Sequence, residues 1–257
     1  MARIFITGSS DGIGQAAARI LADSGHSVVL HARNADRAAS TQKAVPKAEA
    51  VLVGDLSSIA ETKKLAQEAN NLGRGPFDAI VHNAGIGYGS TSSREITADK
   101  LSAVFSVNTL APYILTCLMD RPKSRLLYMS SDSHYGGDEN LRNITQSHSY
   151  SDSKLHDMML ANAFARRWGE QIQVVSMHPG WVRTKMGGSM APGGMDKPAK
   201  ALAEWATGQG KLASLKSGTF FTPRGEESKH PGAGNVGKQE ELLRICQEVS
   251  GVAIPEK

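Results

Sequence analysis

Short apolar runs alternate with longer amphipathic runs along almost the whole chain of 257 residues. The apolar runs have the length of buried strands, and they lie at residues 4–7, 27–31, 50–53, 77–82, 125–129, 173–177 and 218–222. The longer runs are expected to be helices, at residues 13–23, 35–44, 58–70, 99–119, 150–168, 198–206 and 238–250. Regular alternation of strands and helices is typical of a parallel sheet covered by helices on both faces. The pattern predicts a Rossmann-type, doubly wound α/β fold with a sheet of about seven strands.

Length and composition restrict the classes of protein that fit. A chain of this length fits a single domain, expected over residues 1–257. The net charge of +4 is small, and no basic run is interleaved with aromatic residues, so nucleic acid is not an expected partner. No apolar run reaches membrane-spanning length, and the N-terminus lacks a signal-peptide pattern. Two cysteines far apart fit reduced thiols, so we expect a cytoplasmic protein with no membrane partner.

A glycine-rich turn follows the first expected strand and leads into the first helix. It reads Thr7-Gly-Ser-Ser-Asp-Gly-Ile-Gly14. Glycines allow the backbone to turn tightly and to approach a pyrophosphate, which then sits on the amide groups of a helix N-terminus. The spacing differs from the common GxGxxG fingerprint, so an ordinary strand-to-helix turn is the alternative.

Tyr150 and Lys154 lie four residues apart at the start of an expected helix. That spacing places both side chains on one helix face. A lysine cation beside a phenol stabilises the phenolate, which makes Tyr150 a candidate proton donor and acceptor. The pair alone is weak evidence, because such a spacing occurs by chance.

Taken with the glycine turn and the Tyr-x-x-x-Lys pair, further motifs fall in the order found in one enzyme family. The chain resembles the short-chain dehydrogenases/reductases over nearly its whole length. The matching motifs are TGxxxGxG at 7–14, Asp55-Leu56, Asn83-Ala84-Gly85 (with His82 in place of the family's first Asn), Val107-Asn108-Thr109, Ser130-Ser131, Tyr150-x-x-x-Lys154 and Pro179-Gly180.

The resemblance implies the roles of individual residues. The implied catalytic residues are Asn108, Ser131, Tyr150 and Lys154. The gap between Ser131 and Tyr150 is longer than in many relatives, so Ser130 is the first alternative to Ser131 and Ser133 a weaker one. The expected cofactor contacts, from the resemblance and from the residues themselves, are Gly8, Ser10, Asp11, Gly12, Ile13, Gly14, Arg33, Asn34, Asp55, Leu56, Asn83, Ala84, Gly85, Tyr150, Lys154, Pro179, Gly180, Val182 and Thr184.

The end of the second strand bears on the choice of nicotinamide cofactor. A carboxylate there would bind the ribose 2′-hydroxyl and repel a 2′-phosphate. This chain has no acid at that point, and Arg33 offers a guanidinium suited to a phosphate. NADP(H) is therefore expected over NAD(H). Asp11 points the other way, since many NADP-dependent relatives carry a basic residue at its position.

Together these features predict an NADP(H)-dependent oxidoreductase that interconverts a carbonyl compound and an alcohol, with Tyr150 as general acid and base. Residues 1–125 would bind the cofactor, and residues 126–257 would carry catalysis and substrate binding. The alternative is a regulatory protein that senses NADP(H) with little turnover. No metal site is expected, and the resemblance implies a homo-oligomer. A polar loop at 132–149 and a lid at 187–197 are expected to shape the substrate site; His134 and His148 are interpreted as solvated, with substrate contact as the alternative.

Overall fold

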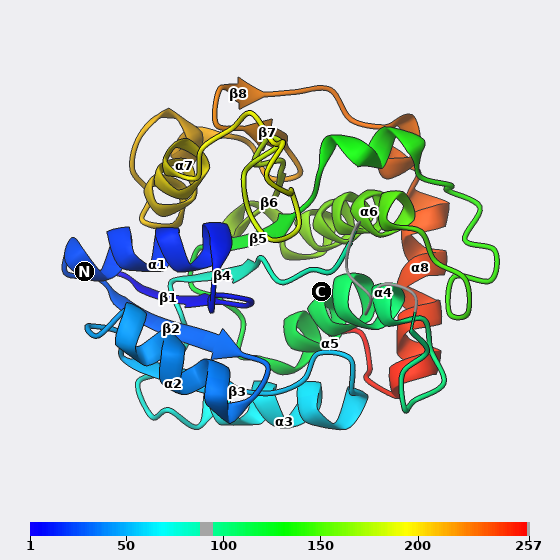
Figure 1. Ribbon diagram of the computed structural model, residues 1–257. Helices are drawn as coiled ribbons and strands as arrows, with labels where there is room; N and C mark the ends of the chain where they lie inside the picture. Colours follow the sequence, from blue (N-terminus) through cyan, green and yellow to red (C-terminus); the bar gives the residue numbers. More distant parts are fainter. Residues whose placement is uncertain (88–94, 256–257) are drawn as a thin grey trace.

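The computed structural model describes residues 1–87 and 95–255 of the chain. Its centre is a single sheet in which eight strands follow the order β3-β2-β1-β4-β5-β6-β7-β8. The first seven are parallel, as predicted, and the eighth runs antiparallel to β7 (Figure 1). The strands are β1 (Arg3–Ile6), β2 (Ser27–Ala32), β3 (Ala50–Val53), β4 (Ala79–His82), β5 (Arg125–Met129), β6 (Gln173–Met177), β7 (Phe220–Thr222) and β8 (Gly225–Glu226).

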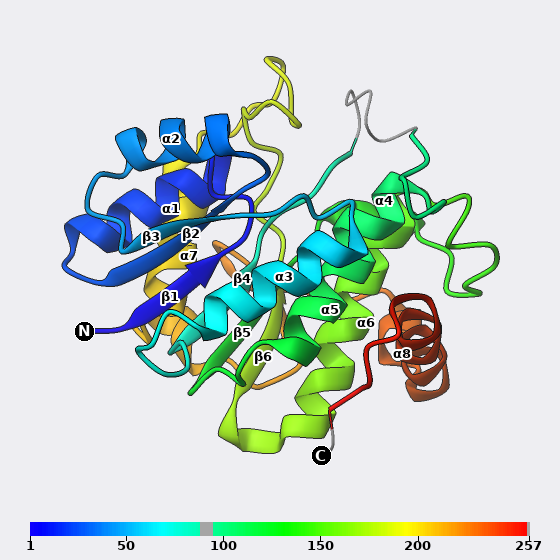
Figure 2. The ribbon, with the colours of Figure 1, turned by 90° about the horizontal axis from the view of Figure 1, so that it is seen from below.

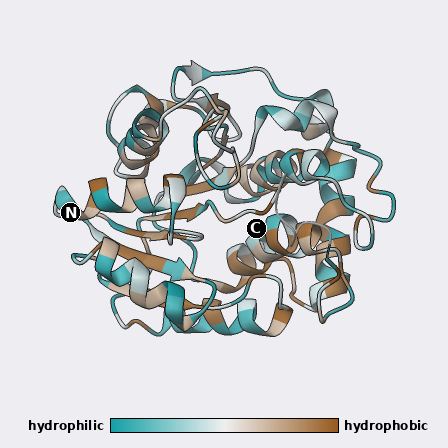
Figure 3. Ribbon diagram, in the orientation of Figure 1, coloured by the Kyte–Doolittle hydropathy of each residue, from teal (hydrophilic) through white to brown (hydrophobic). Residues whose placement is uncertain are grey.

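Burial on both faces explains why the central strands read as almost unbroken apolar runs. Every residue of β1 and β4 is buried, and so are four of the five residues of β6. Parallel strands covered by helices on both sides require such sequences. Figure 3 shows the apolar residues concentrated on the strands and on the helix faces that meet them.

Helices cover both faces of the sheet (Figures 1 and 2). One apolar cluster joins the sheet to α1 and α7, with α2 beside α1, and a second joins it to α3, α5 and α6. The two layers are thus α1 (Gly12–Asp23), α2 (Ala35–Ala44) and α7 (Asp196–Ala206) on one side, and α3 (Ile59–Asn70), α5 (Ala111–Leu118) and α6 (Tyr150–Trp168) on the other.

The last helix, α8 (Val236–Ser250), adds a further layer outside α6 (Figure 2). Arg166 and Arg167 of α6 both pair with Glu240 of α8, at 2.7 and 2.5 Å. Leu242, Leu243 and Cys246 of α8 belong to the same apolar cluster as α6.

Among the predicted helices, the one at 99–119 differs most from the structure. Lys100 has a left-handed backbone (φ 61°), which a right-handed helix cannot contain, so the helix begins only at α4 (Ala103–Phe105). It then widens into a π-helical stretch, η2 (Ser106–Leu110), before α5. Pro112 at the start of α5 has no N–H for the ordinary α-helical hydrogen bond, which fits the wider turn before it.

The remaining predicted strands and helices differ from the structure by at most two residues at either end. The second difference is β8, a strand of two residues that turns back along β7 and ends the sheet. Within the described part of the chain, no helix has the length and apolar character that crossing a membrane requires.

Candidate active site

The candidate site lies at the carboxyl ends of the parallel strands, where ligands bind in sheets of this kind. The glycine turn after β1 is closed by the loop after β4. The Asn83 side chain donates hydrogen bonds to the carbonyl oxygens of Thr7 (2.9 Å) and Gly8 (3.1 Å). The Thr7 hydroxyl oxygen accepts the backbone N–H groups of Asn83 and Ala84, both at 3.0 Å. The turn and the 83–85 loop therefore form one rigid unit.

No side chain would fit at two of the glycines in this turn. A Cβ on Gly8, where φ is +62°, would lie 2.7 Å from the Cα of Ala84. A Cβ on Gly14 would lie 2.5 Å from the Asn83 amide nitrogen. Asp11, at the N-cap of α1, makes no side-chain cap, so the first amide groups of α1 are not satisfied by that residue. A glycine cradle beside uncapped helix amides fits a pyrophosphate.

His31, on β2, also holds the glycine turn in place. This role was not predicted from the sequence. Its Nδ1 accepts the Gly8 N–H at 3.0 Å, and its Nε2 lies 2.8 Å from the Gly54 carbonyl oxygen. These partners require the neutral tautomer with the proton on Nε2. Burial lowers the pKa of His31 below its ordinary value, which keeps the ring neutral.

Residues expected near the adenosine half lie at the ends of β2 and β3. Arg33 is exposed, and Asn34 caps α2 by accepting the Arg37 N–H at 3.0 Å. The Asp55 carboxylate accepts the N–H (2.9 Å) and hydroxyl (2.8 Å) of Ser57, while Leu56 is buried. Each of these expected residues thus borders the same edge of the sheet.

Asp11 is neutralised by two cations that come from other elements. Arg37 of α2 pairs with its carboxylate at 2.7 Å and Lys185 at 3.2 Å. Burial alone would raise the pKa of Asp11, but these two cations hold it below its ordinary value. The acid that argued against NADP(H) in the sequence is therefore surrounded by positive charge. Only the folded chain shows this, because the three residues are far apart in sequence.

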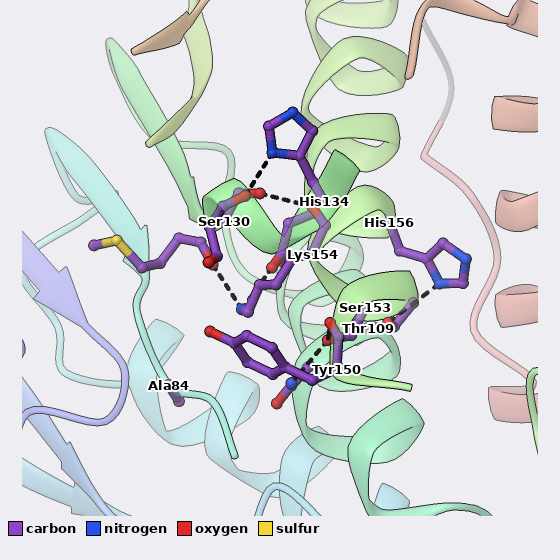
Figure 4. A network of polar contacts seen from close by, with 12 residues as sticks. Ala84, Thr109, Ser130, His134, Tyr150, Ser153, Lys154 and His156 are labelled. Atoms are coloured by element: carbon purple, nitrogen blue, oxygen red, sulfur yellow. Dashed lines mark hydrogen bonds and ion pairs between the residues drawn. The ribbon is translucent and has the colours of Figure 1, made fainter. Parts of the chain in front are cut away.

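The helix that carries Tyr150 and Lys154 begins where the sequence predicts. Ser149 and Asp152 form a reciprocal capping box, with N···O distances of 3.0 and 3.1 Å, which fixes the first turn of α6 at Tyr150. The Lys154 Nζ lies 5.4 Å from the centre of the Tyr150 ring. Figure 4 shows the Lys154 amino group between Ser130 and the Tyr150 ring.

Lys154 is held by two further contacts inside the fold. Its Nζ donates to the Met129 carbonyl oxygen and to the Asp157 carboxylate, both at 2.8 Å. Burial would lower the pKa of Lys154, but the charges of Asp157 and Tyr150 hold it above its ordinary value. Asp157 was not predicted from the sequence as a site residue. Its position three residues after Lys154, on the same helix face, was the available signal.

Asn108 lies in the π-helical stretch η2 and joins α6 to the loop after β4. Its side-chain oxygen accepts the Ile86 N–H at 2.9 Å, and its amide donates to the Ile86 carbonyl (2.8 Å) and to the Ser153 hydroxyl (3.0 Å). The side chain is buried beside Lys154's helix. The predicted residues Asn108, Tyr150 and Lys154 are therefore brought together.

The two serines after β5 are used differently. Ser130 is buried and its hydroxyl donates to the Lys154 carbonyl oxygen at 2.7 Å, which joins β5 to α6. The Ser131 hydroxyl donates to the Asp132 carboxylate at 2.9 Å and accepts the Ser133 N–H at 3.2 Å as the cap of η3 (Asp132–Gly136). Ser130 is thus committed to the backbone of α6, whereas the Ser131 hydroxyl bonds to Asp132 and Ser133 of the segment that follows it.

The segment after β6 borders the cofactor turn. A Cβ on Gly12 would lie 3.6 Å from the Thr184 methyl group, and Val182 forms an isolated bridge with Gly193 across the expected lid. Gly180, after Pro179, has a φ of +92° and turns the chain there. Of the expected residues of this segment, Thr184 lies against the glycine turn. The remaining expected cofactor residues of that turn are Ser10, whose carbonyl accepts the Gln15 amide, and Ile13, which packs against the core.

Two histidines of the 132–149 loop correct an expectation. His134 and His148 are buried, not solvated. His134 packs against Phe220, with 4.8 Å between ring centres, and its Nδ1 contacts the Ser131 carbonyl oxygen. His148 stacks on His156 of α6 at 4.7 Å. The aromatic and apolar side chains that cover them come from distant elements, so the polar loop sequence did not reveal their burial.

Comparison with known proteins identifies the family and agrees with this fold. The sequence model of the short chain dehydrogenase family matches residues 2–193. An uncharacterized oxidoreductase of Emericella nidulans is 79% identical over 255 residues, which cover 99% of both chains. A short-chain dehydrogenase of Penicillium rubens, chyC, is 40% identical over 266 residues, which cover 99% of this chain and 100% of the relative. The chain belongs to the short-chain dehydrogenase/reductase family.

Solved structures share the fold at lower sequence identity. An uncharacterized protein from Mycobacterium paratuberculosis superimposes with a TM-score of 0.80 at 22% identity, over 99% of this chain and 95% of that one. An NADPH-bound carbonyl reductase from chicken fatty liver gives a TM-score of 0.68 at 24% identity, over 89% and 99% of the two chains. The Rossmann-type fold predicted from the sequence is thus confirmed.

Proposed function

We propose that this protein is an NADP(H)-dependent oxidoreductase that interconverts a ketone or aldehyde and the corresponding alcohol. One observation carries the proposal: Tyr150, Lys154 and Asn108 gather at the carboxyl end of β5, beside a glycine turn in which Gly8 and Gly14 have no room for a Cβ. This is the arrangement that a positioned proton donor next to a nicotinamide requires.

The cofactor's pyrophosphate would lie on Gly8, Gly12 and Gly14 and on the first amides of α1. When bound, the nicotinamide supplies or accepts the hydride. NADP(H) is favoured over NAD(H) because Arg33 is exposed at the end of β2 and because Arg37 and Lys185 neutralise Asp11. The chicken carbonyl reductase that shares the fold binds NADPH, which supports the same choice.

The chain's own residues would then manage the proton. In reduction, the Tyr150 hydroxyl donates a proton to the carbonyl oxygen, and in oxidation the phenolate takes it back. The Lys154 ammonium stabilises that phenolate through its charge and would also hold the ribose hydroxyls. The Ser131 hydroxyl would turn from Asp132 toward the substrate oxygen and stabilise its developing charge.

The test measures oxidation of NADPH, with NADH in parallel, across ketones, aldehydes and quinones. We expect turnover with NADPH and a loss of at least about a hundredfold in kcat for Tyr150→Phe, which keeps the ring and removes the hydroxyl group that would carry the proton. NADPH binding should change far less than kcat in the variant, because Tyr150 is only one of many expected cofactor contacts. Tight NADPH binding without turnover of any compound would contradict the enzyme assignment and favour a protein that senses the cofactor.

A further inference from the structure

Asp157 stands out because it is a carboxylate buried in the interior beside the proposed proton-transfer pair. It is 2% exposed, and Lys154, to which it is paired at 2.8 Å, is 4% exposed. Its neighbours on α6, Met158 and Met159, are fully buried. An apolar residue would be the ordinary choice at such a position, and an unpaired buried charge would be very costly. The buried Asp157 carboxylate is therefore compensated by the Lys154 cation with which it is paired.

The Lys154 ammonium group uses part of its hydrogen-bonding capacity inside the protein and leaves part for a ligand. An ammonium group has three N–H donors. Two of them are used within the protein, by the Met129 carbonyl oxygen and by Asp157. A carbon placed at the Cβ position of Gly85 would lie 3.6 Å from the Lys154 Nζ, so the amino group also borders the loop that closes the glycine turn. One donor is left for that side, where the cofactor would lie.

The charges around Asp157 come from two elements. On its own helix it faces Lys154, which in turn lies beside Tyr150. The second element is β5, which carries Tyr128. Burial raises the pKa of Tyr128, and the negative charge of Asp157 adds to this effect. Burial also raises the pKa of Asp157 itself, although the Lys154 ammonium acts in the opposite direction. Lys154 is therefore the cation that balances Asp157.

We propose that Asp157 is a positioning residue for the reaction: its carboxylate fixes the direction of the Lys154 ammonium and keeps that positive charge inside the fold. This inference rests on the proposed function, because Lys154 matters only through Tyr150 and the cofactor. Without the carboxylate, a buried ammonium loses its proton more easily, and one that stays charged favours the Tyr150 phenolate more strongly. Reduction needs the charged lysine and the protonated tyrosine. In either case, therefore, the loss of reductase activity that occurs as the pH rises would begin at a lower pH than in the wild type.

The first test compares pH profiles of carbonyl reduction for the wild type, Asp157→Asn and Asp157→Glu. For Asp157→Asn we expect the alkaline loss of kcat to move to lower pH by about one unit or more, a tenfold change in the proton equilibrium. Asp157→Glu, which keeps the charge, should restore most of the wild-type profile. Equal profiles for the wild type and Asp157→Asn would overturn the proposal.

Glu49 offers a matched control at the opposite end of the strands. Its carboxylate pairs with the buried Arg3 at 2.7 Å, far from the proposed site. Glu49→Gln should lower thermal stability and leave the pH profile unchanged. An equal shift of the profile in Glu49→Gln would show that any lost buried ion pair has this effect, and would also overturn the proposal.

A second readout does not depend on turnover. In protein labelled with ¹³C-lysine, the Cε signal of Lys154, assigned with Lys154→Arg, reports whether the amine is charged. In the wild type we expect it to lose its proton only above the ordinary range of a lysine side chain, and at least about one unit lower in Asp157→Asn. A wild-type midpoint below that ordinary range would contradict the proposal even if the variant does not fold. If no carbonyl compound is turned over, the proposed function fails while this titration still decides the role of Asp157.

Discussion

The glycine turn after β1 and the start of α6 are both rigid, but different forces make them so. The turn is held by neutral hydrogen bonds and by contacts so close that Gly8 and Gly14 cannot carry a Cβ. The start of α6 is held by side chains, among them a buried ion pair and two stacked histidines. The first region therefore depends mainly on shape, and the second on the protonation states of buried side chains. Substitutions should separate the two.

The largest loss of stability is expected in the glycine turn, where close packing at Gly8 leaves no room for a side chain. Gly8→Ala combines a left-handed backbone with a Cβ that would lie 2.7 Å from the Ala84 Cα, so we expect a loss of about 3 kcal/mol or more of unfolding free energy. NADPH affinity should fall with it. The matched control is Gly25→Ala, which has a φ of +82° but nothing within 4 Å of the new Cβ.

Gly25→Ala should cost only the backbone strain, about 1 kcal/mol, and leave NADPH affinity unchanged. Denaturant unfolding and fluorescence titration with NADPH measure both quantities. Equal losses in the two variants would show that backbone strain alone, and not the contact with Ala84, determines the effect.

The next effect concerns the region that depends on charge. Burial lowers the pKa of His148 to about 4, and neither ring nitrogen has a hydrogen-bond partner among the described residues. The unfolded chain binds a proton at His148 below about pH 6.5, whereas the folded chain does so only near pH 4. Its contribution to stability is therefore present above pH 6.5 and is lost as the pH falls toward 4.

His148→Phe keeps an aromatic ring against Phe105 and His156 and removes the titration. Between pH 7 and pH 5 the variant should lose about 2 kcal/mol less unfolding free energy than the wild type. At pH 7 its stability should be close to that of the wild type, since no hydrogen bond is lost. Thermal unfolding across this range is the measurement, and parallel curves for the two proteins would contradict the prediction.

The smallest effect is expected at the exposed carboxyl end of β2, where water and salt screen the charges. Arg33→Ala should weaken NADPH binding about tenfold, close to 1.4 kcal/mol, and leave NADH binding unchanged. Lys43→Ala, on the last turn of α2, is a control for the loss of one positive charge. Equal weakening of NADPH and NADH binding by Arg33→Ala would show that Arg33 does not distinguish the two cofactors.

Local signals predicted most of the fold and the core of the site. Strands buried on both faces and the capping box at Ser149 leave their marks within a few residues of sequence, so the elements they define were placed closely. The left-handed backbone at Lys100 and the strand β8 leave no comparable signal. The grouping of Tyr150, Lys154 and Asn108 followed from the family motifs.

What was missed depends on contacts between distant segments. The pairing of Asp11 with Arg37 and Lys185 exists only once α2 and the segment after β6 meet over the glycine turn. The spacing of Asp157 from Lys154 is visible in the sequence, but its burial follows from the packing of α6 in the folded chain. Burial, and with it the importance of a charge, is a property of the tertiary structure.

The layer that α8 adds outside α6 bears on how copies of this chain could assemble. Most residues of α6 from Ser153 to Phe164 are buried within a single chain, and Arg166 and Arg167 are occupied by Glu240. A second copy that packed against the side of α6 covered by α8 would first have to displace α8 and break these ion pairs. If the expected homo-oligomer forms while α8 stays in place, its subunits meet on another surface, because this side of α6 is already covered from within the chain.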